Sequence, residues 1–174
     1  MKMGFKSLFR ANKILKKYGK EIDKTFKPYR KDIEKLGSEV FKKVEAECAQ
    51  AIKTLKEKVD NFDNAIEEIG GMKNLVLLLW STEEETLDVL TLEAIISWCK
   101  ENLPKDADKT VVLRLSPENF PDNQEEEYKQ VYLTCFLDKN DDVIKNSRMK
   151  YFYANSIDIR LEDSFGDKDM IILK

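Results

Sequence analysis

The sequence contains no histidine, and it has only six glycines, four prolines and three cysteines among its 174 residues. Without histidine, the chain lacks the commonest general base and the commonest metal ligand of proteins. Ser-His and Cys-His nucleophiles are therefore excluded, and most zinc sites are disfavoured. No pair of carboxylates shows a spacing that acid-base catalysis requires. We expect neither a catalytic residue nor a metal site nor a cofactor.

The three cysteines, Cys48, Cys99 and Cys135, are odd in number and far apart, and none belongs to a C-x-x-C pair. This usage is typical of reduced, buried thiols in an intracellular protein. The first residues lead into no apolar core, so we expect no secretory signal. The longest apolar run, Leu75–Trp80, is also far shorter than the roughly 20 residues of a membrane span. We predict a cytoplasmic protein, with association at a membrane surface as the open alternative.

Two local patterns resemble binding motifs and are interpreted more simply. Asp138, Asn140 and Asp142 have the spacing of a calcium loop, but the glycine and glutamate that such a loop needs are replaced by Val143 and Met149. We predict a hairpin turn there, because Asn and Asp tolerate left-handed backbone. The carboxylates and the lysine of residues 122–129 all fall in one loop and are interpreted as solvated surface. Glycine-rich phosphate loops are absent.

Charge is unevenly distributed along the chain. Charged residues make up 36% of the sequence, above the average of about 25%. Residues 1–60 hold 17 Lys and Arg against 9 Asp and Glu, a net charge of +8. Residues 61–174 hold 13 against 24, a net charge of -11, so the overall value of -3 hides a basic part followed by an acidic part.

Apolar residues recur every three or four positions from residue 15 to residue 69, which places them on one face of a helix. A first helix is predicted over residues 2–18, with Gly19 as a weak point and Pro28 as a stronger break. A second apolar stripe covers residues 38–69 and ends at Gly70 and Gly71. We therefore predict a basic amphipathic helical region over residues 1–71, either a coiled coil or a helical hairpin.

Residues 72–174 are predicted to form a compact domain. The leucine content of residues 75–80 favours a helix over a strand. Residues 82–102 are apolar on most sides and follow a capping box at Ser81, which predicts a core helix. Alternating segments at residues 110–115, 131–137, 149–153, 157–161 and 170–173 predict strands. The fold class is α+β: a helical N-terminal half of long amphipathic helices, then a core helix and a small antiparallel β-sheet or meander.

Two surfaces are candidates for binding. A one-sided apolar helix is marginally stable alone, so the second stripe needs a partner helix from the same chain or another. The positions expected to form this helix seam are Val44, Ile52, Leu55, Val59 and Phe62. The positions expected to touch a membrane or a polyanion lie in the basic first helix: Phe5, Lys6, Leu8, Phe9, Arg10, Lys13, Lys16, Lys17 and Lys20.

These features favour a non-enzymatic interaction or adaptor protein whose basic N-terminal helices bind a protein partner or assemble with a second copy. A peripheral membrane protein, anchored to anionic lipid by residues 2–20, is an open alternative. An accessory subunit of a nucleic-acid-processing complex is another. Nucleic acid ranks below the others because the aromatic residues share their stripe with aliphatic ones and are not placed to stack on bases. No small-molecule substrate is evident.

Overall fold

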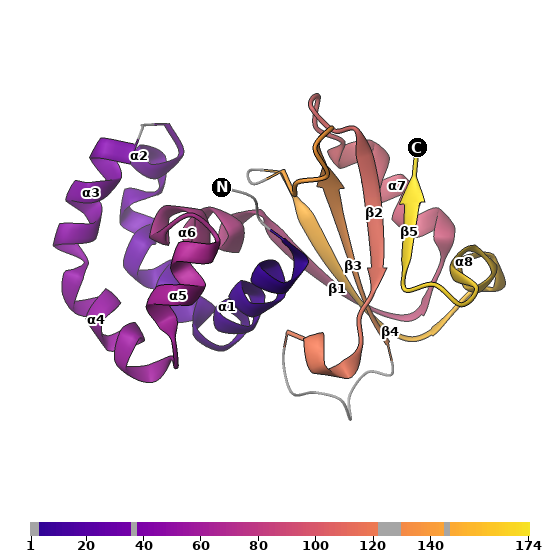
Figure 1. The fold of residues 1–174 in the computed structure, drawn as a ribbon, viewed down its shortest axis with the longest axis horizontal. Coiled ribbons are helices and arrows are strands. Elements are labelled where there is room, and N and C mark those ends of the chain that lie inside the picture. The colour runs from indigo at the N-terminus through magenta and orange to yellow at the C-terminus, as the bar shows by residue number, and fades with distance from the viewer. Residues whose placement is uncertain (1–3, 36–37, 122–129, 145–146) are drawn as a thin grey trace. The chain divides into compact units, whose positions relative to one another are not determined.

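The structure is a computed structural model, and it describes residues 4–35, 38–121, 130–144 and 147–174. The chain divides into two compact units, residues 1–80 and residues 81–174. The first is helical and the second combines a sheet with helices (Figure 1), so the α+β class is confirmed. The boundary between the units lies after residue 80, near the end of α6 (Met72–Ser81), whereas the boundary predicted from the sequence lies after residue 71.

The N-terminal unit is a bundle of helices of very unequal length (Figure 1). Their bounds are α1 (Phe5–Phe26), the 3-10 turn η1 (Lys27–Tyr29), α2 (Arg30–Lys35), α3 (Ser38–Glu47), α4 (Ala49–Lys58), α5 (Phe62–Glu68) and α6 (Met72–Ser81). Helix α1 continues through Gly19. The missing side chain lets α6 approach α1 closely at this point, since a Cβ there would lie 3.2 Å from Leu79 Cδ1. The predicted end of the first helix at residue 18 is thus wrong, whereas the break at Pro28 is confirmed.

The second apolar stripe is divided among α3, α4 and α5 and does not form one long rod. Phe26 of α1 stacks on Phe41 of α3 with ring centroids 6.0 Å apart, and Tyr18 donates a hydrogen bond to the Lys58 carbonyl of α4. The stripe therefore packs within its own unit at these points. Gly70 and Gly71 have φ values of 90° and 111°, which explains why the helix ends where the sequence predicts. Residues 75–80 are helical, as predicted.

The C-terminal unit holds a five-stranded sheet in the order β1-β4-β3-β2-β5. Its elements are β1 (Thr82–Leu90), α7 (Leu92–Asn102), β2 (Lys109–Arg114), the 3-10 turn η2 (Pro117–Asn119), β3 (Gln130–Leu137), β4 (Met149–Ile157), α8 (Ile159–Phe165) and β5 (Met170–Leu173). The pairs β2–β3 and β3–β4 join consecutive strands in antiparallel fashion, as the meander prediction requires. Strand β5 departs from a meander, because it returns to pair with β2 in antiparallel fashion. Strand β1 joins β4 in parallel, which makes the sheet mixed.

Both helices of this unit pack on one face of the sheet. The core there joins Ile95 and Trp98 of α7 and Phe165 of α8 to the even-numbered residues of the central strands. Trp98 stacks on Phe136 with centroids 5.8 Å apart, and Phe165 lies 5.4 Å from Tyr132. The opposite face of the sheet is also apolar and carries the buried residues Val111, Leu133, Cys135 and Tyr151.

Two predictions of secondary structure for this unit are wrong. Residues 82–90 form strand β1, not the first half of a helix, so only residues 92–102 are the helix that packs on the sheet. Pairing with β4 gives Glu83 and Glu85 partners in Arg148 and Lys150, at 2.7 and 2.6 Å, and this overrides helix propensity. Residues 159–165 form α8 and not a strand, because Asp158 caps the helix by accepting a hydrogen bond from the Leu161 N–H.

The turn between β3 and β4 agrees with its prediction. Asp138 Oδ1 accepts hydrogen bonds from the backbone N–H groups of Asn140 and Asp142, at 2.8 and 3.1 Å. Asp141 adopts a φ of 63°, the left-handed conformation that Asp and Asn tolerate. The aspartates thus bind their own backbone. The interpretation of residues 122–129 lies outside the described residues.

Candidate functional site

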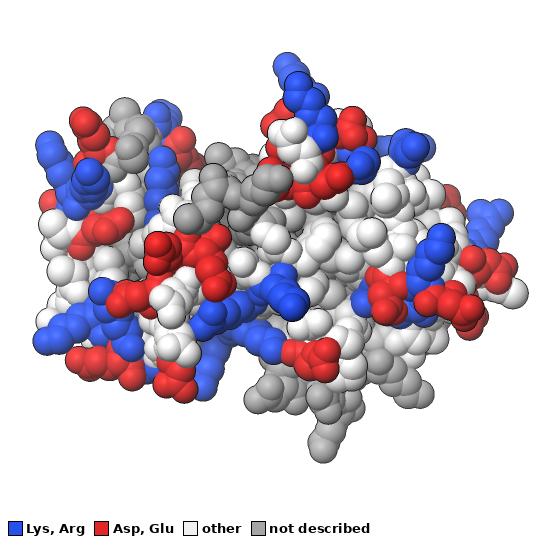
Figure 2. Space-filling view, viewed as in Figure 1, with Lys and Arg blue, Asp and Glu red and all other residues white. Residues whose placement is uncertain are grey.

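The basic residues of α1, together with Lys27 directly after it, form one continuous stripe. At about 100° per residue, Lys6, Arg10, Lys13, Lys16, Lys17, Lys20, Lys24 and Lys27 fall within an arc of roughly 120°. The apolar residues Leu8, Leu15, Ile22 and Phe26 lie on the opposite side of the helix and are buried. In the space-filling view, blue side chains gather where α1 crosses the N-terminal unit (Figure 2). We call this set of eight cationic residues the basic stripe.

Most of the stripe is exposed, and several of its members, Lys13 and Lys16 among them, interact with other groups of the chain. Arg10 lies 3.6 Å from a Glu68 oxygen, and the Lys17 ammonium lies 5.5 Å from the centre of the Tyr18 ring. Lys6, Lys13, Lys16, Lys17, Lys20, Lys24 and Lys27 are exposed. An ion pair as exposed as Arg10–Glu68 contributes little, about 0–1 kcal/mol. The stripe therefore keeps a positive potential that an external anion meets.

The three apolar members of the predicted polyanion contact differ in exposure. Leu8 has an exposed fraction of 0%, so it is not accessible while the protein is folded. Phe5 and Phe9 are half-buried and stack on each other, with centroids 6.3 Å apart. The two rings remain at the end of the basic stripe, next to Lys6.

The predicted helix seam is largely enclosed in the folded chain. Val44, Leu55 and Phe62 are buried, and Ile52 and Val59 are half-buried. Val59 directly follows α4, and the other four residues lie in α3, α4 and α5, which pack on one another in chain order. Binding of a partner at this seam stays a prediction, and only Ile52 and Val59 offer it any exposed surface.

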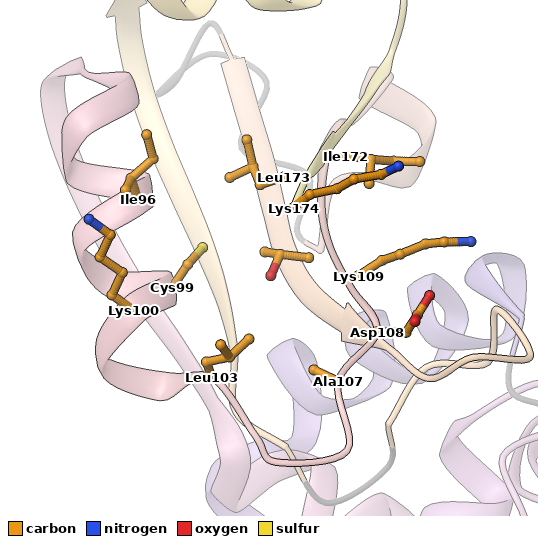
Figure 3. A pocket seen from close by; sticks show the side chains of 11 residues that line it. Ile96, Cys99, Lys100, Leu103, Ala107, Asp108, Lys109, Ile172, Leu173 and Lys174 are labelled. Atoms are coloured by element: carbon orange, nitrogen blue, oxygen red, sulfur yellow. The ribbon is translucent and has the colours of Figure 1, made fainter.

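A pocket in the C-terminal unit was not predicted from the sequence. It lies between α7 and the ends of β2 and β5, with a volume of about 410 Å³. Figure 3 shows Ile96 and Cys99 of α7, and Leu103 directly after it, facing Leu173 of β5 across the pocket. Lys100 and Lys174 also line the pocket, and their ammonium groups extend outward on opposite sides (Figure 3). The interior is thus apolar and the rim is charged, which is typical of a binding pocket.

The thiol in this pocket is not a nucleophile at neutral pH. Burial raises the pKa of Cys99 from 9.0 to about 11, and burial raises the pKa of Cys135 to about 12. Only the thiolate is strongly nucleophilic, so neither group is activated. Among the described residues, no group of three or more Cys, Asp and Glu side chains is placed to hold a metal ion. No described helix is long and apolar enough to cross a membrane.

The burial of these thiols gives a direct prediction. We expect iodoacetamide at pH 8 to leave Cys99 and Cys135 unmodified in the native protein and to modify both in urea, as measured by intact-protein mass spectrometry. Above pH 9.0 the unfolded thiols ionise while the folded ones stay protonated, so the free energy of unfolding falls as the pH rises from 9.0 toward 11. Equal modification rates with and without urea would contradict this burial.

Comparison with models of known protein families, with curated protein sequences and with solved structures finds no match for this chain. Two surfaces of this chain are candidates for binding: the basic stripe of α1 and the pocket beside β5.

Proposed function

We propose that this chain is a non-enzymatic interaction protein and that the basic stripe of α1 binds an acidic surface of a protein partner. The observation that carries the proposal is the position of the stripe opposite the buried face of α1. The apolar side of the helix is buried within the folded chain, and the basic side stays exposed. A folded helix with this arrangement presents charge, not an apolar seam, to a partner.

The charge of the rest of the chain favours a protein partner over a nucleic acid or an anionic bilayer. Residues 61–174 carry a net charge of -11, and a uniformly charged polyanion would repel them at long range. An acidic patch on a protein is limited in area, so it can contact the stripe alone. The patch can also belong to a second copy of this chain, because its own C-terminal region is acidic.

One observation supports the membrane alternative. The half-buried pair Phe5 and Phe9 adjoins Lys6, and aromatic rings beside lysines are typical of peripheral membrane contacts. Against it, Leu8 is enclosed and offers no apolar anchor. For nucleic acid, the two rings already stack on each other, which leaves less aromatic surface for bases.

The test compares two charge-reversal variants with the same change in net charge. The stripe variant carries Lys6→Glu, Lys17→Glu and Lys20→Glu, and the control variant carries Lys42→Glu, Lys43→Glu and Lys53→Glu, all at exposed positions. The probe is a labelled oligoglutamate peptide, with binding followed by fluorescence anisotropy at low salt. Each exposed charge pair contributes about 0.2–1 kcal/mol, so the loss of three pairs should weaken the affinity of the stripe variant by about 3- to 150-fold. The control variant should retain most of the binding.

Further probes decide between the classes of partner. Phosphatidylserine vesicles and duplex DNA are titrated beside the peptide, and light scattering measures the mass of the protein alone. Stripe-dependent binding to vesicles or DNA that exceeds binding to the peptide would assign the stripe to that ligand and reject the protein partner. A mass that falls in the stripe variant would identify a second copy as the partner. Equal peptide affinities in both variants would reject the proposal.

A further inference from the structure

The two edge strands of the sheet differ sharply in their protection against pairing. Strand β1 carries Glu83, Glu84, Glu85 and Asp88, and charges of this kind discourage another strand from adding to an edge. Strand β5 reads Met-Ile-Ile-Leu, with neither a charge nor a proline. Met170 and Ile172 are 41% and 46% exposed. The edge at β5 therefore has the properties of a surface that accepts a strand.

The register of β5 shows which backbone groups point outward. The Arg114 N–H donates to the Asp169 carbonyl at 2.8 Å, and Val112 pairs with Ile171. In an antiparallel ladder, hydrogen-bonded and non-hydrogen-bonded pairs alternate. The N–H and C=O groups of Ile171 therefore point toward β2, and those of Met170 and Ile172 point to the outer edge. Within the described residues, the sheet ends at this edge.

The pocket lies on the same side of the sheet as the helices and begins at this edge. Leu173 belongs to the face that α7 covers, and it lines the pocket together with Cys99 and Leu103. A strand added to β5 would lie about 4.8 Å beyond it and would direct every second side chain to that face. One such side chain would reach the pocket of about 410 Å³ that lies between α7 and β5 (Figure 3).

The charge at the pocket rim selects the occupant. Lys100, Lys109 and Lys174 line the pocket against one carboxylate, that of Asp108. Lys109 is held by Asp141 at 2.5 Å, so the other two lysines carry most of the positive charge that a ligand meets. Residues 81–174 as a whole hold 12 Lys and Arg against 21 Asp and Glu. A cationic rim on an acidic unit favours an acidic ligand.

We propose that the edge of β5 binds an extended peptide segment of a partner protein by strand addition. The segment carries a large apolar side chain, which fills the pocket, and acidic residues at its flanks, which meet Lys100 and Lys174. Backbone hydrogen bonds to Met170 and Ile172 supply affinity, and the pocket supplies sequence preference. This site is separate from the basic stripe of α1 and does not depend on it.

The experiment uses the full chain and a labelled synthetic peptide that alternates phenylalanine with threonine and has glutamates at both ends. We expect saturable binding in fluorescence anisotropy and slower hydrogen exchange at the amides of Met170 and Ile172. Ile172→Pro removes the outward N–H without touching the ladder to β2, and it should weaken binding at least tenfold. The matched control is Ile159→Pro, because residue 159 is the first of α8 and is 71% exposed, a position where proline is tolerated.

Two further measurements keep the proposal testable if Ile172→Pro does not fold. The same peptide with N-methyl groups at alternate positions cannot pair through its backbone, so it should bind at least tenfold more weakly to the unaltered protein. Leu103→Glu places a carboxylate at the pocket and should repel the acidic peptide to a similar extent. Unchanged binding of the N-methylated peptide, or of folded Ile172→Pro, would overturn the proposal. A dimer of the protein alone that Ile172→Pro splits would assign the edge to a second copy and would also overturn it.

Discussion

Replacing Leu8 with aspartate should destabilise the folded protein by more than about 4 kcal/mol, because it buries an unpaired carboxylate in place of an apolar side chain. Leu8 has an exposed fraction of 0%, although it lies between the exposed Lys6 and the half-exposed Arg10. Domains of this size are stable by about 5–15 kcal/mol, so the loss is a large part of the total. Urea unfolding followed by far-UV circular dichroism measures it.

Lys6→Asp is the control for this prediction. It introduces the same carboxylate two residues earlier on α1, at an exposed position, and we expect a change within about 0.5 kcal/mol. The comparison separates a structural role of Leu8 from a role in binding. A Leu8→Asp protein with unaltered stability and weaker binding to phosphatidylserine vesicles would show that Leu8 is a membrane contact, contrary to its burial.

The second large effect is expected at Phe136 in the centre of the sheet. Its ring is fully buried and stacks on Trp98, with an interplanar angle of 15°. Phe136→Ala removes this contact and leaves a cavity between β3 and α7, at a cost of about 3–5 kcal/mol. The midpoint of urea unfolding should fall accordingly, and the fluorescence of Trp98 should change because its neighbour is lost.

Val89→Ala serves as the matched control on the same sheet. Val89 lies on the edge strand β1 and is 47% exposed, so its truncation should change stability by less than about 1 kcal/mol. A loss of under 1 kcal/mol for Phe136→Ala would mean that the ring does not support the packing of α7 on the sheet.

Local signals in the sequence were reliable where one residue determines the backbone. Pro28 ends α1, the glycines at 70 and 71 end α5, and the aspartates after β3 make the predicted turn. In each case the conformation follows from a missing donor, a positive φ or a side chain that bonds its own backbone. Such features depend little on the rest of the fold.

The sequence was misleading where distant pairing decides the structure. The segment from residue 82 to residue 90 has the composition of a helix start, but pairing with β4 and two ion pairs make it a strand. The segment after Asp158 alternates like a strand, but the cap at Asp158 starts a helix. Both outcomes depend on partners that no local window contains.

The two candidate sites also differ in how far the sequence predicts them. Charge counting along α1 is enough to predict the basic stripe, although it does not tell which apolar neighbours are enclosed. The pocket could not be predicted, since Leu103 and Leu173 are brought together only by the packing of α7 beside the sheet. The one sign of this site in the sequence is the short run Met170–Leu173, which lacks the charged residues that protect an edge strand against pairing.

The parallel pairing of β1 with β4 has a consequence for how this protein is made. Thr82 pairs with Met149 and Leu90 with Ile157, so β1 cannot pair with β4 until the chain has been synthesised to about residue 157. The helices of residues 5–81 need only nearer neighbours and can form earlier in translation. We expect the acidic residues of β1 to oppose aggregation of the unpaired strand during that interval, because charges break up aggregation-prone segments.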